Sequence, residues 1–270
     1  MDYIAPETIV DACRALEADG SHCLAGGQSL IAMMNLGLAT PGRLVSLRRI
    51  AELRGIDSTP DGGLRIGSMT THAELAELRP DSPAATLLAQ TARVVAYPAV
   101  RNRGTLGGSV ALADPAADYP VALIAIGAVI ELVSATGRRS LAADAFFRGM
   151  FDTALVRGEI VAAVRMPRNP AHGGTAYEKL SLVAGDFAIL SVAAIAGSET
   201  RVAIGGYAMK PVLVSGLDAA GDLREQAARE LARLPDPPGD ERASAAYRRR
   251  VAPELVRRAV RAASMYARHE

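Results

Sequence analysis

The residues with the clearest chemical potential are two glycine pairs, at 26–27 and 107–108, each followed by small polar side chains. A glycine pair lets the backbone turn sharply and point several N–H groups at one place, and such a nest binds an anion without a charged side chain. Gln28 and Ser29 after the first pair, and Ser109 after the second, add neutral donors. The pattern favours a pyrophosphate that is held but not attacked.

Neither loop carries a standard nucleotide-binding motif. GxGxxG and GxxxxGK[ST] are absent at both places, so a Rossmann fingerprint and a P-loop are unsupported. Paired glycines are also common in ordinary tight turns. From the loops alone, both interpretations stay open: two unrelated turns, or two halves of one anion site.

Other polar residues are weaker candidates. His72 begins a predicted short helix, where it either makes local hydrogen bonds or approaches a ligand. Asp114 and Asp118 resemble a carboxylate pair, but the Asp-Pro step at 114–115 is more simply a turn. Two cysteines, Cys13 and Cys23, are too few for an iron–sulfur cluster, which takes about four thiolates. We expect no metal site and a reducing compartment.

Charge and hydropathy exclude several classes of partner. Lys and Arg total 30 against 29 Asp and Glu, so no basic surplus points to nucleic acid or to an anionic membrane. The longest apolar run, 120–133, is shorter than the roughly 20 residues that span a bilayer. The first ten residues lack the pattern of a signal peptide. We expect no nucleic-acid partner, no membrane insertion and a cytoplasmic location.

Hydrophobic periodicity predicts the elements that position the two loops. A short buried strand leads into the first glycine pair, and a helix just after a loop would add a favourable dipole for an anion. Helices are predicted at 7–18, 83–97, 119–127 and the C-terminus, and strands at 43–47, 63–69, 128–134 and 159–167. The Pro- and Gly-rich segment 168–174 is the predicted domain boundary. Strands mixed with helices favour an α+β or α/β fold of two or three lobes.

Four motifs, in order along the chain, resemble the FAD-binding medium subunit of molybdenum hydroxylases. They are AGGQSL at 25–30, GSMTTHAEL at 67–75, VRNRGTLGGSVALADPAADYP at 100–120, and AYEKL with GDFA at 176–188. The segment 243–263 is similar to the closing helix of that family. The resemblance covers essentially the whole chain and is nearest to the carbon monoxide dehydrogenase medium subunit and the flavin domain of xanthine dehydrogenase.

The resemblance implies an α+β fold in two domains. A two-lobed, PCMH-type FAD-binding domain would span 1–170, with lobes of about 1–55 and 56–170. A C-terminal domain, 171–270, would hold a small antiparallel sheet and helices. The implied partners are a molybdopterin-binding large subunit and an iron–sulfur small subunit, from which FAD would pass electrons to an external acceptor. A stand-alone FAD-dependent oxidase or dehydrogenase and a non-catalytic flavin-binding module remain as alternatives.

The resemblance also implies which residues contact FAD. The set is Ala25, Gly26, Gly27, Gln28, Ser29, Leu30, Thr70, His72, Gly104, Thr105, Leu106, Gly107, Gly108, Ser109, Ala117, Asp118, Ile160, Val161, Lys179 and Phe187. Both glycine loops would cradle the pyrophosphate, and Asp118 would bind the adenosine end. Lys179 would lie near the flavin or the dinucleotide, and Phe187 beside the isoalloxazine ring. Some relatives have His in place of Gln28 and Asn or Asp in place of Ser109. Neither loop contains His or Cys, so non-covalent FAD is expected.

Overall fold

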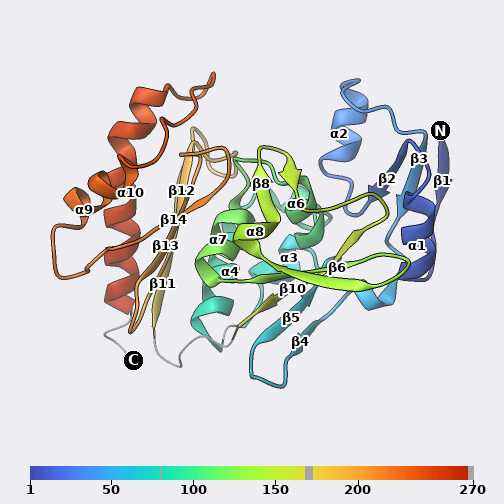
Figure 1. Ribbon diagram of the computed structural model, residues 1–270, viewed down its shortest axis with the longest axis horizontal. Helices are drawn as coiled ribbons and strands as arrows, with labels where there is room; N and C mark the ends of the chain where they lie inside the picture. Colours follow the sequence, from blue (N-terminus) through green and yellow to red (C-terminus); the bar gives the residue numbers. More distant parts are fainter. Residues whose placement is uncertain (80, 168–172, 267–270) are drawn as a thin grey trace.

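The structure, a computed structural model, describes residues 1–79, 81–167 and 173–266 (Figure 1). Figure 1 shows a small N-terminal lobe, a central lobe, and a C-terminal sheet covered by a long helix, arranged side by side. The predicted α+β architecture with a small antiparallel C-terminal sheet is confirmed. The predicted domain boundary at 170–171 lies outside the described residues. No helix within the described ranges is long and apolar enough to cross a membrane.

The N-terminal lobe is a three-stranded parallel sheet with two helices. The sheet has the order β1-β3-β2, with β1 at Asp2–Ile4, β2 at Ser21–Leu24 and β3 at Arg43–Ser46. The first helix, α1 (Ile9–Leu16), buries its apolar face, and its N-terminus is capped by the Thr8 hydroxyl. The second helix, α2 (Leu30–Asn35), buries no residue. The first glycine loop therefore joins a sheet strand to an exposed helix.

The central lobe contains a five-stranded antiparallel sheet of order β4-β5-β10-β6-β7. Its strands are β4 (Ile56–Ser58), β5 (Leu64–Gly67), β6 (Val129–Val133), β7 (Arg138–Ala142) and β10 (Ile160–Met166). Around it lie η1 (Ala51–Leu53), α3 (His72–Ala76), α4 (Pro83–Val94), α5 (Pro98–Arg101), α6 (Leu106–Leu112), α7 (Asp118–Ile126), α8 (Ala143–Phe146) and the hairpin of β8 (Phe147–Gly149) with β9 (Asp152–Thr153). The second glycine loop leads into α6.

The C-terminal domain packs one antiparallel sheet between helices. Its strands are β11 (Gly174–Leu180), β12 (Leu190–Ala196), β13 (Arg201–Gly205) and β14 (Val212–Val214), in that order, followed by α9 (Leu223–Leu231) and α10 (Ala245–Tyr266). The long helix α10 packs on β11 and β12, and α7 of the central lobe contacts β12 and β13 (Figure 1). Because all nine residues of α7 are buried, this helix joins the central lobe to the C-terminal domain.

One arginine of the C-terminal helix is buried and not solvated like the neighbouring basic side chains. Arg248 is buried, and its guanidinium donates hydrogen bonds to the carbonyl oxygens of Ile189 and Gly206 while pairing with Asp240 at 2.6 Å. The side chain thus ties α10 to the start of β12 and the end of β13. Burial of this arginine is tolerated because acceptors pair both terminal nitrogens of the guanidinium, although its Nε is buried without a partner among the described residues.

Candidate cofactor site

The first glycine loop presents a run of backbone N–H groups without protein partners. Gly27 has a left-handed backbone (φ +74°), which reverses the chain between β2 and α2. Within the part of the chain that the structure describes, no protein atom accepts a hydrogen bond from the N–H groups of residues 26–30. The Gln28 amide turns back to the Gly26 carbonyl oxygen at 3.3 Å, and Ser29 makes no side-chain cap. This geometry agrees with the predicted anion nest.

The second glycine loop differs from the first, because its N–H groups are already used inside the protein. Leu106 donates to the Thr70 carbonyl oxygen at 2.9 Å, and Gly107 donates to the Ser68 carbonyl oxygen at 2.8 Å. The N–H of Gly108 donates to the Thr105 hydroxyl at 3.2 Å, which caps α6. These N–H groups are therefore not free for an anion, and the contact of this loop with the pyrophosphate stays a prediction. The loop is a rigid, strand-like segment paired with residues 68–72.

The two glycine loops are in direct contact, although about eighty residues separate them. A Cβ atom on Gly26 would stand 2.1 Å from the Arg103 carbonyl oxygen and 2.9 Å from the Gly104 Cα. A Cβ on Gly108 would approach the Ala25 side chain at 3.7 Å. Gly26 is therefore required by the close approach of the two lobes. The nest lies at their junction, where a ligand can contact both.

The remaining glycines of the second loop serve packing within the central lobe. A Cβ on Gly104 would stand 2.6 Å from the His72 Nε2, and one on Gly107 would stand 2.3 Å from the Ser68 Cβ. Neither distance is possible between real atoms, so both positions exclude a side chain. The loop can consequently press flat against the segment 68–72, and Ser109 at the start of α6 stays partly exposed.

His72 is a buried residue in this arrangement, with 6 % of its surface exposed. The backbone N–H of His72 donates to the Gly104 carbonyl oxygen at 3.0 Å, and the ring Nδ1 forms a 3.1 Å hydrogen bond with the Tyr119 hydroxyl. Burial, with a smaller effect from Arg101, lowers the pKa of His72 to about 4. The Arg101 guanidinium bonds to the Val95 and Ala96 carbonyl oxygens at 3.0 and 2.7 Å. His72 is thus a neutral supporting residue.

Asp118, predicted at the adenosine end, and Lys179, predicted near the flavin or the dinucleotide, form a buried ion pair of 2.9 Å. Their side chains are 6 % and 8 % exposed. The Tyr177 hydroxyl donates to the other oxygen of the Asp118 carboxylate at 2.8 Å, and Lys179 also donates to the Val94 carbonyl oxygen at 3.2 Å. Burial raises the pKa of Asp118, and the ammonium of Lys179 opposes that effect. The pair joins α7 to β11, and the predicted ribose contact of Asp118 stays a prediction.

The other predicted residues are more scattered. Ile160 and Val161 are buried in two different hydrophobic clusters, so their side chains are not exposed beside the glycine loops. Phe187 is 51 % exposed, with the Arg242 guanidinium over its ring at 5.9 Å from the centroid. The Thr70 carbonyl oxygen accepts the hydrogen bond of Leu106 in the second glycine loop, and the Leu30 N–H is the last of the first loop's N–H groups. Ala117 is the N-cap residue of α7.

Two residues with a clear place in the site were not predicted from the sequence. Arg103 contributes the carbonyl oxygen that meets Gly26, and Tyr119 holds His72. The Arg103 contact involves only backbone, which leaves no residue-type signal. Tyr119 lies within the ADPAADYP motif and next to Asp118, so that motif was the available signal.

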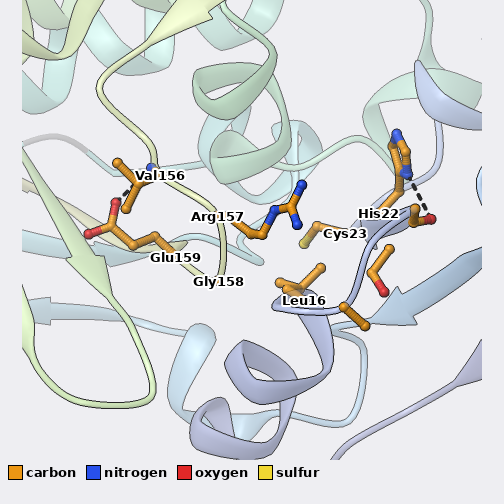
Figure 2. A pocket seen from close by; sticks show the side chains of 10 residues that line it. Leu16, His22, Cys23, Val156, Arg157, Gly158 and Glu159 are labelled. Carbon is orange, nitrogen blue, oxygen red and sulfur yellow. Dashed lines mark hydrogen bonds between the residues drawn. The ribbon is translucent and has the colours of Figure 1, made fainter.

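A separate cavity of about 350 Å³ lies between α1, β2 and the segment 156–159. Figure 2 shows Arg157 extending across it toward His22 and Cys23. Arg157 also pairs with Asp19, which links the two lobes at this point. None of the predicted FAD residues lines the cavity. Within the described ranges, no cluster of three or more His, Cys, Asp or Glu side chains could hold a metal ion.

One lobe has a strand, a glycine loop and an exposed helix, and this loop is pressed against a glycine loop of the other lobe. Such an arrangement is typical of a nucleotide-binding protein. Comparison with known families identifies it further. Residues 1–169 match the family described as the FAD binding domain in molybdopterin dehydrogenase, and residues 175–263 match the CO dehydrogenase flavoprotein C-terminal domain. The chain belongs to this family of FAD-binding medium subunits.

Individual relatives agree over nearly the full length. The nicotine 6-hydroxylase medium subunit of Paenarthrobacter nicotinovorans is 32 % identical, with 96 % of this chain and 95 % of the relative covered. The carbon monoxide dehydrogenase medium chain of Hydrogenophaga pseudoflava is 35 % identical, with 97 % and 96 % covered. The solved Cu,Mo-CO dehydrogenase superposes with a TM-score of 0.93 at 32 % identity, over 99 % of this chain and 98 % of that one.

FAD is therefore the cofactor of this chain, which is an FAD-dependent oxidoreductase component. The observed residues fit that cofactor in one specific respect. The partnerless N–H groups at 26–30 suit the pyrophosphate, and Gly26 has no room for a side chain.

Proposed function

We propose that this chain is the electron-transferring flavoprotein subunit of a molybdenum-containing dehydrogenase. Electrons from iron–sulfur clusters of a partner would reach FAD held by this chain and leave to an external acceptor. The observation that carries the proposal is the free N–H nest at 26–30, pressed against the second lobe through Gly26. FAD supplies the electron exchange, and the protein supplies binding, orientation and electrostatics.

The residues of the cradle have separable roles in this proposal. The N–H groups of 26–30 hold the pyrophosphate by hydrogen bonds alone, which supports non-covalent binding. Residues 104–108 form the rigid wall against which that nest is placed. Phe187 offers an exposed aromatic face of the kind that covers a flavin ring. Asp118 and Lys179 lie where the central lobe meets the C-terminal domain and brace the adenosine side.

The proposed partners follow from the relatives. The nicotine 6-hydroxylase and carbon monoxide dehydrogenase relatives are named as medium components, and the solved CO dehydrogenase contains molybdenum. By analogy, we propose a molybdopterin-binding large subunit and an iron–sulfur small subunit as partners of this chain. A cytoplasmic location is part of the same proposal and agrees with two cysteines that remain free thiols.

The alternative of a stand-alone flavoenzyme gains no support from the site. The bases considered for it are His72 and Tyr177. His72 is buried, and the Tyr177 hydroxyl is bonded to Asp118, so neither is free to accept a proton from a substrate.

The test has two stages. The chain is first purified alone, and its flavin is measured before and after acid precipitation. One FAD per chain, released into the supernatant, is the expected result. The loaded chain is then mixed without oxygen with a chemically reduced iron–sulfur small subunit. Rapid loss of the oxidised-flavin absorbance would support the proposal. A flavin that stays oxidised with that subunit, yet is reduced directly by an organic substrate, would overturn it.

A further inference from the structure

His72 lies at the centre of a buried series of contacts that runs from the first glycine loop to the C-terminal domain. Gly26 touches the segment 103–104, and the His72 ring lies against Gly104. The Tyr119 hydroxyl is bonded to that ring, and Tyr119 follows Asp118, which pairs with Lys179 of β11. The first two contacts are close packing, and the last two are a hydrogen bond and an ion pair, so a shift of one group displaces its neighbour.

His72 contacts Gly104 of the second glycine loop with both its backbone and its side chain. The backbone N–H of His72 donates to the Gly104 carbonyl oxygen at 3.0 Å, and the side-chain Nε2 fills the space in which a Gly104 Cβ would stand. The imidazole therefore supports the same peptide whose neighbour, the Arg103 carbonyl, meets Gly26. The bonds of Arg103 and Gly104 to the Val100 carbonyl oxygen also hold this segment, so a smaller or tilted side chain at 72 would loosen it against Gly26 without releasing it.

The contact between His72 and Tyr119 fixes the orientation of the ring. Tyr119 is 1 % exposed, its ring centroid is 5.1 Å from that of His72, and its hydroxyl is within 3.1 Å of Nδ1. Burial lowers the pKa of His72 to about 4 and raises that of Tyr119, so both groups are neutral at physiological pH. If the hydrogen bond between the Tyr119 hydroxyl and His72 Nδ1 is removed, a buried polar atom of the remaining residue has no partner, which costs free energy.

We propose that His72, oriented by Tyr119, is a positioning residue for FAD. It holds the segment 103–104 against Gly26 and so sets the direction of the N–H nest at 26–30. This inference rests on the proposed function of the glycine loops as the FAD cradle. Its consequence is that FAD affinity depends on the Tyr119 hydroxyl, a group that makes its hydrogen bond to His72 and lies outside the nest.

The experiment measures the dissociation constant of FAD for the full-length chain by flavin fluorescence. Tyr119→Phe removes only the hydroxyl, and we expect about fivefold weaker binding, the effect of one net hydrogen bond. His72→Ala should weaken binding more than tenfold, and His72→Gln should restore part of the loss. In the double variant, Tyr119→Phe should add nothing to His72→Ala, because the hydroxyl acts through the imidazole.

A second buried tyrosine provides the matched control. The Tyr207 hydroxyl donates to the Leu231 carbonyl oxygen at 3.4 Å inside the C-terminal domain, and Tyr207 is 2 % exposed. Tyr207→Phe should lower thermal stability as Tyr119→Phe does, while leaving the FAD dissociation constant within twofold. Equal weakening of FAD binding by the two variants would mean general loosening of the fold and would overturn the inference.

The outcomes also separate this inference from the proposed function. If the wild-type chain fails to bind FAD, the proposed function and the inference both fall. If the wild type binds FAD and Gly26→Ala does not, the cradle is confirmed. Should Tyr119→Phe and His72→Ala then bind FAD as tightly as the wild type, only the positioning role is refuted.

Discussion

A single added methyl group tests the contact between the two lobes most directly. In Gly26→Ala, the new Cβ would stand 2.1 Å from the Arg103 carbonyl oxygen, a distance that real Cβ atoms essentially never show. The obstacle is backbone, and it is held in place: Arg103 and Gly104 both donate to the Val100 carbonyl oxygen, at 3.1 and 2.7 Å. The loops would have to separate by about 1 Å to relieve the overlap.

The magnitude follows from that separation. Forcing a methyl group into a packed contact costs roughly 1–3 kcal/mol of folding free energy. A displaced nest would also lose charge-assisted hydrogen bonds to the pyrophosphate, each worth about 1.5 kcal/mol or more. The loss of two such bonds weakens binding about 100-fold. We therefore expect Gly26→Ala to unfold at lower temperature and to lose FAD during purification.

The assay compares Gly26→Ala with Gly137→Ala, each titrated with FAD and melted with and without it. A Cβ on Gly137 meets no atom within 4 Å, and its backbone is not left-handed, so this variant should match the wild type. A Gly26→Ala protein with wild-type FAD affinity and melting temperature would refute the contact between the loops.

Three further outcomes are expected from buried groups. The pKa of His72 is about 4 in the folded chain and 6.5 in the unfolded chain. Between these pH values the unfolded state binds more protons than the folded state. Acidification from pH 6.5 to 4 should therefore lower the free energy of unfolding by roughly 3 kcal/mol. Urea unfolding at several pH values should show this loss in the wild type but a weaker one in His72→Gln. Lys179→Met should cost about 3–5 kcal/mol in urea unfolding by leaving the Asp118 carboxylate buried without its ammonium partner, and adding Asp118→Asn should recover part of that loss. Replacing both Cys13 by Ala and Cys23 by Ser should cost about 1 kcal/mol, mainly at the buried Cys13, and leave the ratio of FAD to protein unchanged.

Much of the fold could be predicted because the central strands carry strong local patterns. The strands expected at 43–47, 63–69, 128–134 and 159–167 correspond to β3, β5, β6 and β10. The elements that were not predicted, such as β1, β4 and β14, have three residues each and depend on pairing with a neighbour. Such short edge strands have too few residues for an alternating pattern, so tertiary contacts decide them.

Candidate site residues could be named from the sequence, but the contacts among them could not. Asp118 and Lys179 are sixty-one positions apart, and no pattern in their local sequence predicts a buried ion pair between α7 and β11. The contact of Gly26 with Arg103 is even harder to predict from the sequence. It involves the backbone carbonyl of Arg103, which every residue type has. Sequence motifs mark which residues a site requires, whereas the partner of each residue emerges only when distant segments pack.

The two glycine loops show why similar sequence patterns can have different physical roles. In the first loop, Gly27 provides the left-handed turn and the N–H groups of 26–30 remain available to a ligand. In the second loop, the N–H groups of 106–108 are consumed by Thr70, Ser68 and Thr105, and the glycines only permit close packing. In the site proposed here, one loop would bind the anion and the other would support it. A chain built this way binds its anion well only when both lobes are correctly docked, which makes cofactor affinity a sensitive measure of the lobe junction.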